Sequence, residues 1–284
     1  MAYGPSTTRT RRTRTEIGDL DEAIITAVSL EAPVTLRGVY YRCVSAGAID
    51  KTENAYRTVG RRLVDLRRQG RVRYRDITDG TRWITAPTTY DSIEDALSET
   101  ARLYRRRLWS YSQYNLQLYT EKDAISGVIL PATSMWDVPL GVLRGYVSES
   151  FAWTVAQSLS SEKWNIVAQL GDHDPSGVGA WSNFCEKVQA FAPNSYIEFT
   201  RLAVTPAQVV DMALPTRPTK TSDPRARGWV GGSVEVDAIP ARTLREIVNR
   251  WISAYVDSAE LGIIEAAEVS EREILTNLAA GWTS

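Results

Sequence analysis

Apolar positions in the first quarter of the chain recur at the spacing of amphipathic helices. They predict helices near residues 19–30, 36–45 and 52–69. In the middle stretch, four such residues fall at i, i+3, i+4 and i+7, namely Leu36, Val39, Tyr40 and Cys43. Two short runs at 72–74 and 82–84 then flank a Thr-Asp-Gly turn, which is typical of a β-hairpin. Three helices followed by a hairpin predict a winged helix.

The pattern changes in the second part of the chain, where short apolar runs alternate with helical segments. The runs predict buried strands at 116–119, 138–143 and 164–170. The segments that follow them predict helices at 125–130, 148–159 and 178–191. Because this alternation is typical of a parallel sheet with flanking helices, the second part is expected to be an α/β domain.

Beyond residue 191 the pattern predicts a few further elements. They are a strand at 196–202, a helix from Thr205-Pro206, a loop at 215–232, and two closing helices at 241–256 and 260–280. Residues 234–238 alternate like a strand, with Glu235 and Asp237 on one face. We expect that face to meet solvent rather than a metal ion.

Acidic residues follow two of the predicted strands directly. Glu121 comes after the first strand, while Asp172 and Asp174 come after the third. An aspartate pair on a loop is, by itself, most often a turn or a helix cap. Neighbouring parallel strands end at the same edge of a sheet, so the three carboxylates are expected to converge there. Their short, hard oxygen ligands suit Mg²⁺, which makes them the candidate metal ligands.

Basic residues concentrate in the first part of the chain. Residues 1–110 carry 20 lysines and arginines against 14 acids, whereas residues 111–284 carry 13 against 20. On the third predicted helix, Arg57, Arg61 and Arg68 lie opposite the apolar stripe. So many arginines on one face favour phosphate binding over a merely solvated surface. Further candidates for DNA contacts are Arg62, Arg82 and Lys220.

The two acidic segments together resemble a known domain. A glutamate after one strand and Asp-x-Asp-Pro-x-Gly after a later one, here Glu121 and residues 172–177, are similar to the TOPRIM domain of topoisomerases, primases and related nucleases. The Asp-Pro-x-Gly form resembles the A subunit of topoisomerase VI and its meiotic double-strand-break relatives. In that family a winged helix with a nucleophilic tyrosine precedes the TOPRIM domain. The segment Arg37-Gly38-Val39-Tyr40-Tyr41 resembles the family's Arg-x-x-Tyr-Tyr motif.

The resemblance implies roles for individual residues. Tyr41, the last tyrosine of the motif, is the implied nucleophile, and Arg37 is its phosphate-binding neighbour. The helical spacing places both residues on a face beside the apolar stripe, outside the core. By this resemblance Tyr41 would attack a DNA phosphodiester and become linked to the 5′ phosphate. Mg²⁺, or Mn²⁺, would be held by Glu121, Asp172 and Asp174.

The resemblance covers roughly residues 19–240 and implies four segments. They are a basic tail at 1–17, a winged-helix domain at 18–88, a helical linker at 89–114, and a TOPRIM domain with C-terminal helices at 115–284. Since the family's tyrosine works with the metal of the other subunit, a homodimer that cuts double-stranded DNA is expected. The chain looks most similar to stand-alone "mini-A" proteins of bacteria and phages. It has no Gly-x-x-x-x-Gly-Lys-Ser/Thr loop, so strand passage would need a separate ATPase B-type subunit.

Two other functions stay open at this point. A TOPRIM site also suits a hydrolytic nuclease, in which the metal activates water and Tyr41 is incidental. A non-catalytic DNA-binding protein would need neither the tyrosine nor the acids. No apolar run approaches the roughly 18 residues of a membrane span, so we expect a soluble, cytoplasmic protein without membrane partners. With one histidine and two distant cysteines, zinc sites and histidine-based triads are not expected.

Overall fold

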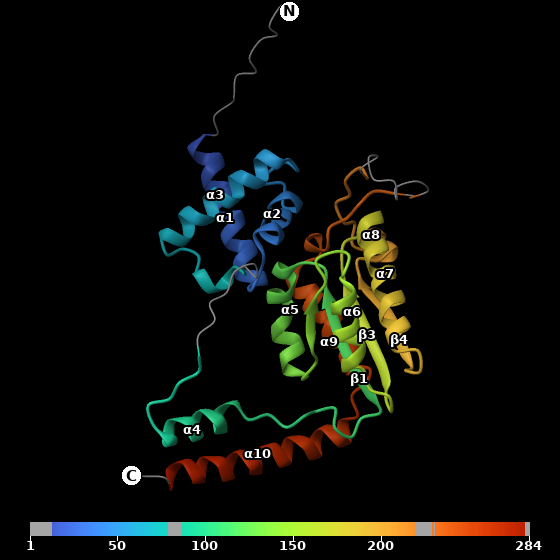
Figure 1. Cartoon of the computed structure of the whole chain (residues 1–284). Helices are drawn as coiled ribbons and strands as arrows, with labels where there is room; N and C mark the ends of the chain where they lie inside the picture. Colours follow the sequence, from blue (N-terminus) through green and yellow to red (C-terminus); the bar gives the residue numbers. More distant parts are fainter. Residues whose placement is uncertain (1–12, 79–86, 220–228, 230, 282–284) are drawn as a thin grey trace, which may run out of the picture. The chain divides into compact units, whose positions relative to one another are not determined.

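The computed structural model describes residues 13–78, 87–219, 229 and 231–281. Two compact units are formed, one by residues 1–78 with 237–242 and the other by residues 79–236 with 243–284. The first unit is helical, and the second contains a four-stranded parallel sheet (Figure 1). The expected mixed α/β architecture is therefore confirmed.

Three helices build the first unit. They are α1 (Arg14–Glu31), α2 (Leu36–Ser45) and α3 (Glu53–Arg68). Each begins after a threonine whose hydroxyl accepts a hydrogen bond from a backbone N–H of the first turn, at Thr13, Thr35 and Thr52. The most buried members of the core include Leu20, Ile24, Val39, Val59 and Leu66. The helices expected from the apolar pattern are confirmed, although α1 begins within the segment expected to be a tail.

The expected hairpin after α3 is wrong in its first arm. A 3₁₀ helix, η1 (Tyr74–Asp76), lies there instead of a strand. Arg73 Nε pairs with Asp76 Oδ2 at 2.9 Å, and the Asp76 carbonyl accepts the Val34 N–H at 3.0 Å. Because these contacts close the segment into a turn, its backbone does not adopt the extended conformation of a strand. The second arm, at 82–84, lies outside the described residues.

Four parallel strands form the sheet of the second unit, in the order β2–β1–β3–β4. They are β1 (Tyr114–Thr120), β2 (Leu140–Val142), β3 (Trp164–Leu170) and β4 (Ile197–Ala203). β1 and β3 run side by side over their whole length, with Thr120 opposite Leu170. The two central strands therefore end at the same level, as the alternation predicted.

Helices alternate with the strands along the chain and follow them. They are α5 (Asp123–Met135), α6 (Glu149–Ser158), α7 (Pro175–Phe191), α8 (Pro206–Asp211) and α9 (Ala241–Ser253). In Figure 1, α6 lies in front of the strands and α9 behind them. The face under α6 and α7 holds a cluster of buried side chains that includes Tyr119, Val167 and Phe184. The central strands are thus buried, and residues exposed to a ligand can lie only at their ends.

Two further helices pack against each other away from the sheet. They are α4 (Ile93–Leu103), within the expected linker, and α10 (Ser258–Ala280), as Figure 1 shows. Polar contacts hold the chain after α4 to α10: the Tyr104 hydroxyl donates to Glu271 at 2.6 Å, and Arg106 pairs with the same carboxylate. Within the described ranges, every helix is too short or too polar to cross a membrane.

Candidate functional site

Glu121 and Asp172 stand side by side at the carboxyl ends of β1 and β3. Glu121 follows the last residue of β1, and its N–H donates to the Leu170 carbonyl at the end of β3 (3.1 Å). The Asp172 N–H in turn donates to Glu121 Oε2 (2.9 Å). Strand pairing therefore brings the first two predicted acids together.

Asp174 joins them as the N-cap of α7. Its Oδ1 accepts the Gly177 N–H (2.8 Å), and Pro175 lies in the first turn. A glycine is needed at 177, because a Cβ there would stand 2.8 Å from the Asp172 carbonyl oxygen. The same point lies 3.0 Å from Glu121 Oε2 and 3.4 Å from Asp174 Oδ1. The two carboxylates thus flank one small space at the start of α7.

A cavity of about 330 Å³ opens at these carboxylates. It is lined by Glu121, Asp174, Pro175, Ser176, Arg217, Pro218, Thr219 and Ser233. Asp172 is absent from this lining and is 5% exposed. Its Oδ1 accepts the Val236 N–H (2.9 Å), and its Oδ2 accepts the Lys122 ammonium (2.8 Å). The cavity therefore presents two of the three predicted acids, with the third behind them.

Glu235 is a fourth acid of this cluster, and the expectation that it faces solvent is wrong. It is 4% exposed; its Oε1 pairs with Arg217 Nη1 at 2.7 Å, and its Oε2 lies 3.8 Å from Lys122 Nζ. The backbone is the reason: Val234 forms an antiparallel bridge with His173, through bonds of 2.8 and 3.0 Å, which carries the next residue into the site. Alternation could not signal this, because the apolar neighbours of Glu235 are buried as well.

Asp237, also expected at a solvent face, is buried too. It is 4% exposed, and its Oδ1 accepts a hydrogen bond from the Thr35 hydroxyl (2.8 Å) within the first unit. The stretch around it forms an isolated bridge and the 3₁₀ helix η3 (Val236–Ala238) instead of the expected strand. Buried carboxylates are costly unless they are paired, so both acids depend on these partners.

Three cations of the cluster, Lys122, Arg201 and Arg217, were not singled out from the sequence. Lys122 is adjacent to Glu121 in the chain, which is the one signal that could have found it. Arg201 on β4 donates from Nη1 to Gln169 (3.0 Å) and from Nη2 to the Asp172 carbonyl oxygen. Nothing in the sequence marks Arg201, because its place depends on β4 pairing with β3.

The acids are held in a setting that disfavours their charged forms. Burial raises the pKa of Glu121, and the nearby Asp172 carboxylate raises it further. Burial also raises the pKa of Asp172, while the Lys122 ammonium opposes that rise. Burial and the positive charge of Arg201 lower the pKa of His173. A further cation at the cavity would stabilise the anionic carboxylates.

Replacing Glu121 with glutamine is expected to change how the stability of the metal-free protein depends on pH. Because the folded-state pKa of Glu121 is raised, its contribution to stability is full below the ordinary value of 4.5 and is lost as the pH rises through the folded-state pKa. Glutamine carries no charge, so the Tm of Glu121→Gln should increase relative to wild type over that rise. Thermal melts in EDTA at stepped pH values measure this difference, and a constant difference would contradict it.

Glu121 and Asp174 are the residues that can hold a divalent cation directly. Mg²⁺ usually keeps several waters and binds one or two protein carboxylates, which fits two acids that line an open cavity. In the part of the chain that the structure describes, no three or more histidine, cysteine, aspartate or glutamate side chains are grouped so as to hold a metal ion. The donor set that fits is therefore a carboxylate pair completed by water.

Tyr41 is buried, contrary to the expectation that it lies outside the core. It is 4% exposed, and its neighbour Tyr40 is 6% exposed. The centroids of the two rings are 5.4 Å apart, and the Lys51 ammonium lies 5.4 Å from the centroid of the Tyr41 ring. These neighbours cover a face that helical spacing alone leaves open. The Arg37 guanidinium lies over the Tyr56 ring of α3, at 5.1 Å.

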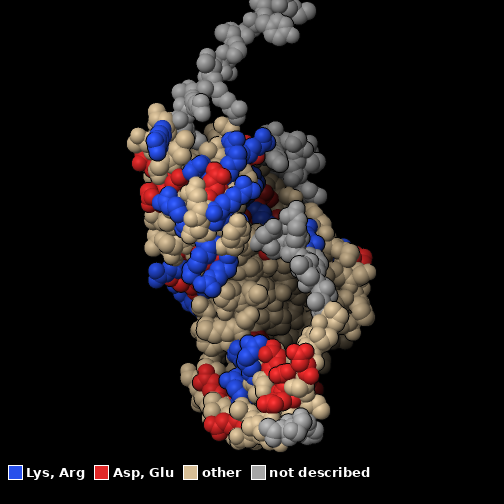
Figure 2. Space-filling view, turned by 90° about the vertical axis from the view of Figure 1, so that its left-hand side faces the viewer, with Lys and Arg blue, Asp and Glu red and all other residues tan. Residues whose placement is uncertain are grey.

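Arg57, Arg61 and Arg68 share an open face of α3. They line a groove of about 810 Å³ together with Leu36, Asn54, Gly60, Val64 and Asp65. Figure 2 shows lysine and arginine side chains gathered over the helical unit. The three side chains predicted to contact DNA are thus brought together on one surface.

Arg62 has a different role from these three. Its guanidinium binds Asp21 on α1 (2.6 and 2.8 Å) and Asp65 on α3 (3.0 Å). It therefore ties two helices together and is committed to carboxylates rather than to phosphates. The other two candidates, Arg82 and Lys220, lie outside the described residues.

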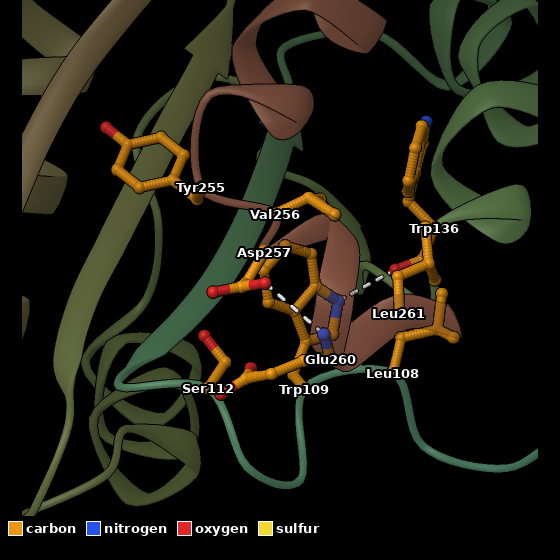
Figure 3. A pocket seen from close by; sticks show the side chains of 9 residues that line it. All are labelled: Leu108, Trp109, Ser112, Trp136, Tyr255, Val256, Asp257, Glu260 and Leu261. Atoms are coloured by element: carbon orange, nitrogen blue, oxygen red, sulfur yellow. Dashed lines mark hydrogen bonds between the residues drawn. The ribbon is translucent and has the colours of Figure 1, made fainter. Parts of the chain in front are cut away.

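A second cavity is too small to hold a substrate (Figure 3). It has room for about 20 Å³, which is the space of roughly one water molecule. Two of its polar groups are already hydrogen-bonded: Trp109 Nε1 donates to the Trp136 carbonyl (2.7 Å), and Asp257 accepts the Glu260 N–H (3.2 Å). The acid-lined cavity is the better candidate site.

No protein-family model and no curated protein matches this chain. Its function is therefore inferred from its own residues. They offer an acid-lined cavity at the edge of a sheet and an arginine-lined groove on a helix.

Proposed function

We propose that this protein is a DNA-cleaving transesterase similar to the A subunit of topoisomerase VI. The observation that carries the proposal is the convergence of Glu121 and Asp174 on an open cavity at the carboxyl edge of a parallel sheet. The arginine face of α3 and the Arg-x-x-Tyr-Tyr motif within α2 support it. In this proposal the first unit is a winged helix and the second is a TOPRIM domain.

In the proposed reaction the Tyr41 hydroxyl oxygen attacks a DNA phosphorus. As the new bond forms, the tyrosine hydroxyl gives up its proton, the bond from phosphorus to the 3′ oxygen breaks, and the leaving oxygen takes up a proton. The strand stays joined to the protein through a 5′-phosphotyrosyl link, so the reverse reaction can reseal it. Arg37 supplies a fixed positive charge next to the attacked phosphate.

Mg²⁺, or Mn²⁺, is the cofactor of this proposal, with Glu121 and Asp174 as its direct ligands. When bound, the ion stabilises the negative charge that develops on the phosphate and the leaving oxygen. The Asp172 N–H orients the Glu121 carboxylate, and the Gly177 N–H orients that of Asp174. The protein thus holds both carboxylates in place before a cation arrives.

Double-stranded DNA is the proposed substrate, and α3 is the proposed contact. Two copies, each cutting one strand, would produce a double-strand break, so the active form is a homodimer. Strand passage would require a separate ATPase B-type subunit. The cytoplasm is the proposed location, since the substrate is chromosomal or phage DNA.

Replacing Arg57, Arg61 and Arg68 with alanine is expected to weaken binding to DNA of any sequence. Each lost phosphate contact should reduce the slope of log affinity against log salt by about one unit. Fluorescence anisotropy with labelled duplexes over a salt series measures both quantities. A charge-matched control replaces Arg102, Arg107 and Arg144, which are exposed arginines of the second unit. Equal losses in the two triple variants would place the contact elsewhere.

Covalent trapping tests the proposed function. Supercoiled plasmid is incubated with the protein and Mg²⁺ or Mn²⁺, the reaction is stopped with detergent, and the products are separated with and without protease. Linear DNA that carries attached protein through its 5′ ends is expected. Cleaved DNA with free 5′ phosphates would replace the transesterase with a hydrolytic enzyme.

A hydrolytic nuclease is the second candidate, and the burial of Tyr41 favours it. In that case the cavity acids would hold a metal ion that activates water to attack the phosphate, and the tyrosine would be part of the core. If the protein binds DNA but leaves it intact with either metal, it is a non-catalytic DNA-binding protein.

A further inference from the structure

Three carboxylates and two cations form a continuous set of ion pairs in the acidic cluster. Lys122 Nζ lies 2.8 Å from Asp172 Oδ2 and 3.8 Å from Glu235 Oε2. The Arg217 guanidinium lies 2.7 Å from Glu235 Oε1 and 3.8 Å from Asp174 Oδ2. Glu235 is therefore the carboxylate that both cations share.

The acids fall into two pairs with different surroundings. Asp172 and Glu235 are 5% and 4% exposed and do not line the cavity. Glu121 and Asp174 do line it, and Glu121 Oε1 has no hydrogen-bond partner among the residues that the structure describes. One pair is thus open to an incoming ion, and the other is enclosed.

Lys122 occupies the space between the two enclosed carboxylates. Mg²⁺ binds carboxylate oxygens at about 2.0–2.1 Å, so an ion there would need the oxygen that the ammonium now contacts. The ammonium and a divalent ion repel each other, and both cannot be held at Asp172 Oδ2. The buried pair needs one cation, because two adjacent carboxylates without one are costly to bury.

We propose that Lys122 is a fixed counter-ion that fills a potential second cation position between Asp172 and Glu235. The protein then binds a single divalent cation per chain, at Glu121 and Asp174. This inference rests on the proposed metal-dependent function and predicts how many divalent cations each chain binds. Lys122 is a positioning residue, and Glu235 is the acid that anchors it together with Arg217.

Counting bound Mn²⁺ by electron paramagnetic resonance tests this inference on the full chain. Wild type is expected to bind one ion, and Lys122→Met two, because the variant frees Asp172 and Glu235 for a second ion. The double variant Lys122→Met/Glu235→Gln should return to one. Lys163→Met is the matched control: its ammonium binds the carbonyls of Trp109 and Ser110, so one ion is expected.

A second measurement tests the inference even if Lys122→Met is less stable than wild type. A divalent ion in place of the ammonium should stabilise that variant, so saturating Mn²⁺ should raise its Tm by more than it raises that of wild type. Equal shifts, or no more ions bound to folded Lys122→Met than to wild type, would overturn the inference.

Failure of the proposed function looks different. If wild type and Lys163→Met bind no ion but Lys122→Met binds one, the counter-ion role stands and the wild-type metal site is lost. A different outcome is that wild type binds one ion, Glu121→Gln none, and Lys122→Met still one. That result would refute only the counter-ion role and would support the metal site at Glu121. If neither wild type nor Lys122→Met binds an ion, both proposals fall.

Discussion

Replacing Tyr41 with phenylalanine is expected to abolish the covalent protein–DNA adduct. The change removes the oxygen that attacks phosphorus and keeps the ring, which packs against Tyr40 and lies under Lys51. Loss of a catalytic nucleophile typically lowers the rate by about a thousandfold or more. The measurement is the yield of protein-linked plasmid after a detergent stop. DNA affinity should be retained, because the phosphate-binding arginines lie on α3.

Tyr40→Phe is the matched control for this experiment. It removes the same atom from the adjacent residue, whose hydroxyl donates to the Thr52 carbonyl at 3.2 Å. Loss of that hydrogen bond costs about 1 kcal/mol of stability, and adduct formation should continue. If Tyr41→Phe cleaves DNA at the wild-type rate, the chemistry is hydrolytic and the buried tyrosine is structural.

Exchanging Glu121 for glutamine is expected to stop cleavage while DNA binding persists. Glutamine keeps the shape and an oxygen that can accept the Asp172 N–H, but it removes one of the two charges that face the cavity. A divalent ion contributes several kcal/mol to a phosphoryl-transfer transition state. Losing its charged ligand should therefore lower the cleavage rate by roughly a hundredfold or more. Plasmid cleavage over a Mg²⁺ series measures the effect.

Asp123→Asn is the matched control for Glu121→Gln. Asp123 lies two residues further along and pairs with Arg144 at 2.6 Å, outside the acidic cluster. The control makes the same change of charge, so its cleavage rate should stay near that of wild type. If both variants cleave like wild type, the acidic cluster is structural. If both fail, the loss reflects local charge or folding rather than a specific ligand.

The positions of Glu121, Asp172 and Asp174 at one sheet edge could be predicted because they depend on local signals. The strands are apolar runs, and each acid follows the end of a strand. Parallel alternation then brings neighbouring strand ends to the same level. The structure agrees, with the Asp172 N–H bonded to Glu121 Oε2.

The same reasoning failed for Tyr41, for a physical reason. Helical periodicity gives the angle of a side chain around its own helix, but not what other segments place against it. Tyr41 lies beside the apolar stripe, yet the Tyr40 ring and Lys51 leave it 4% exposed. The role of Arg62 could not be predicted from its helix either. Unlike the other α3 arginines, it forms an ion pair with Asp21 on α1.

What the sequence alone determined is the three helices of the first unit, the parallel α/β part and the acids at its edge. These follow from periodicity and from residues next to each other in the chain. Only the tertiary structure decided that Glu235 joins Asp172, that Lys122 lies between them, and that Glu121 and Asp174 face the cavity. The backbone bridge of His173 to Val234 and the pairing of buried charges depend on segments distant in the chain.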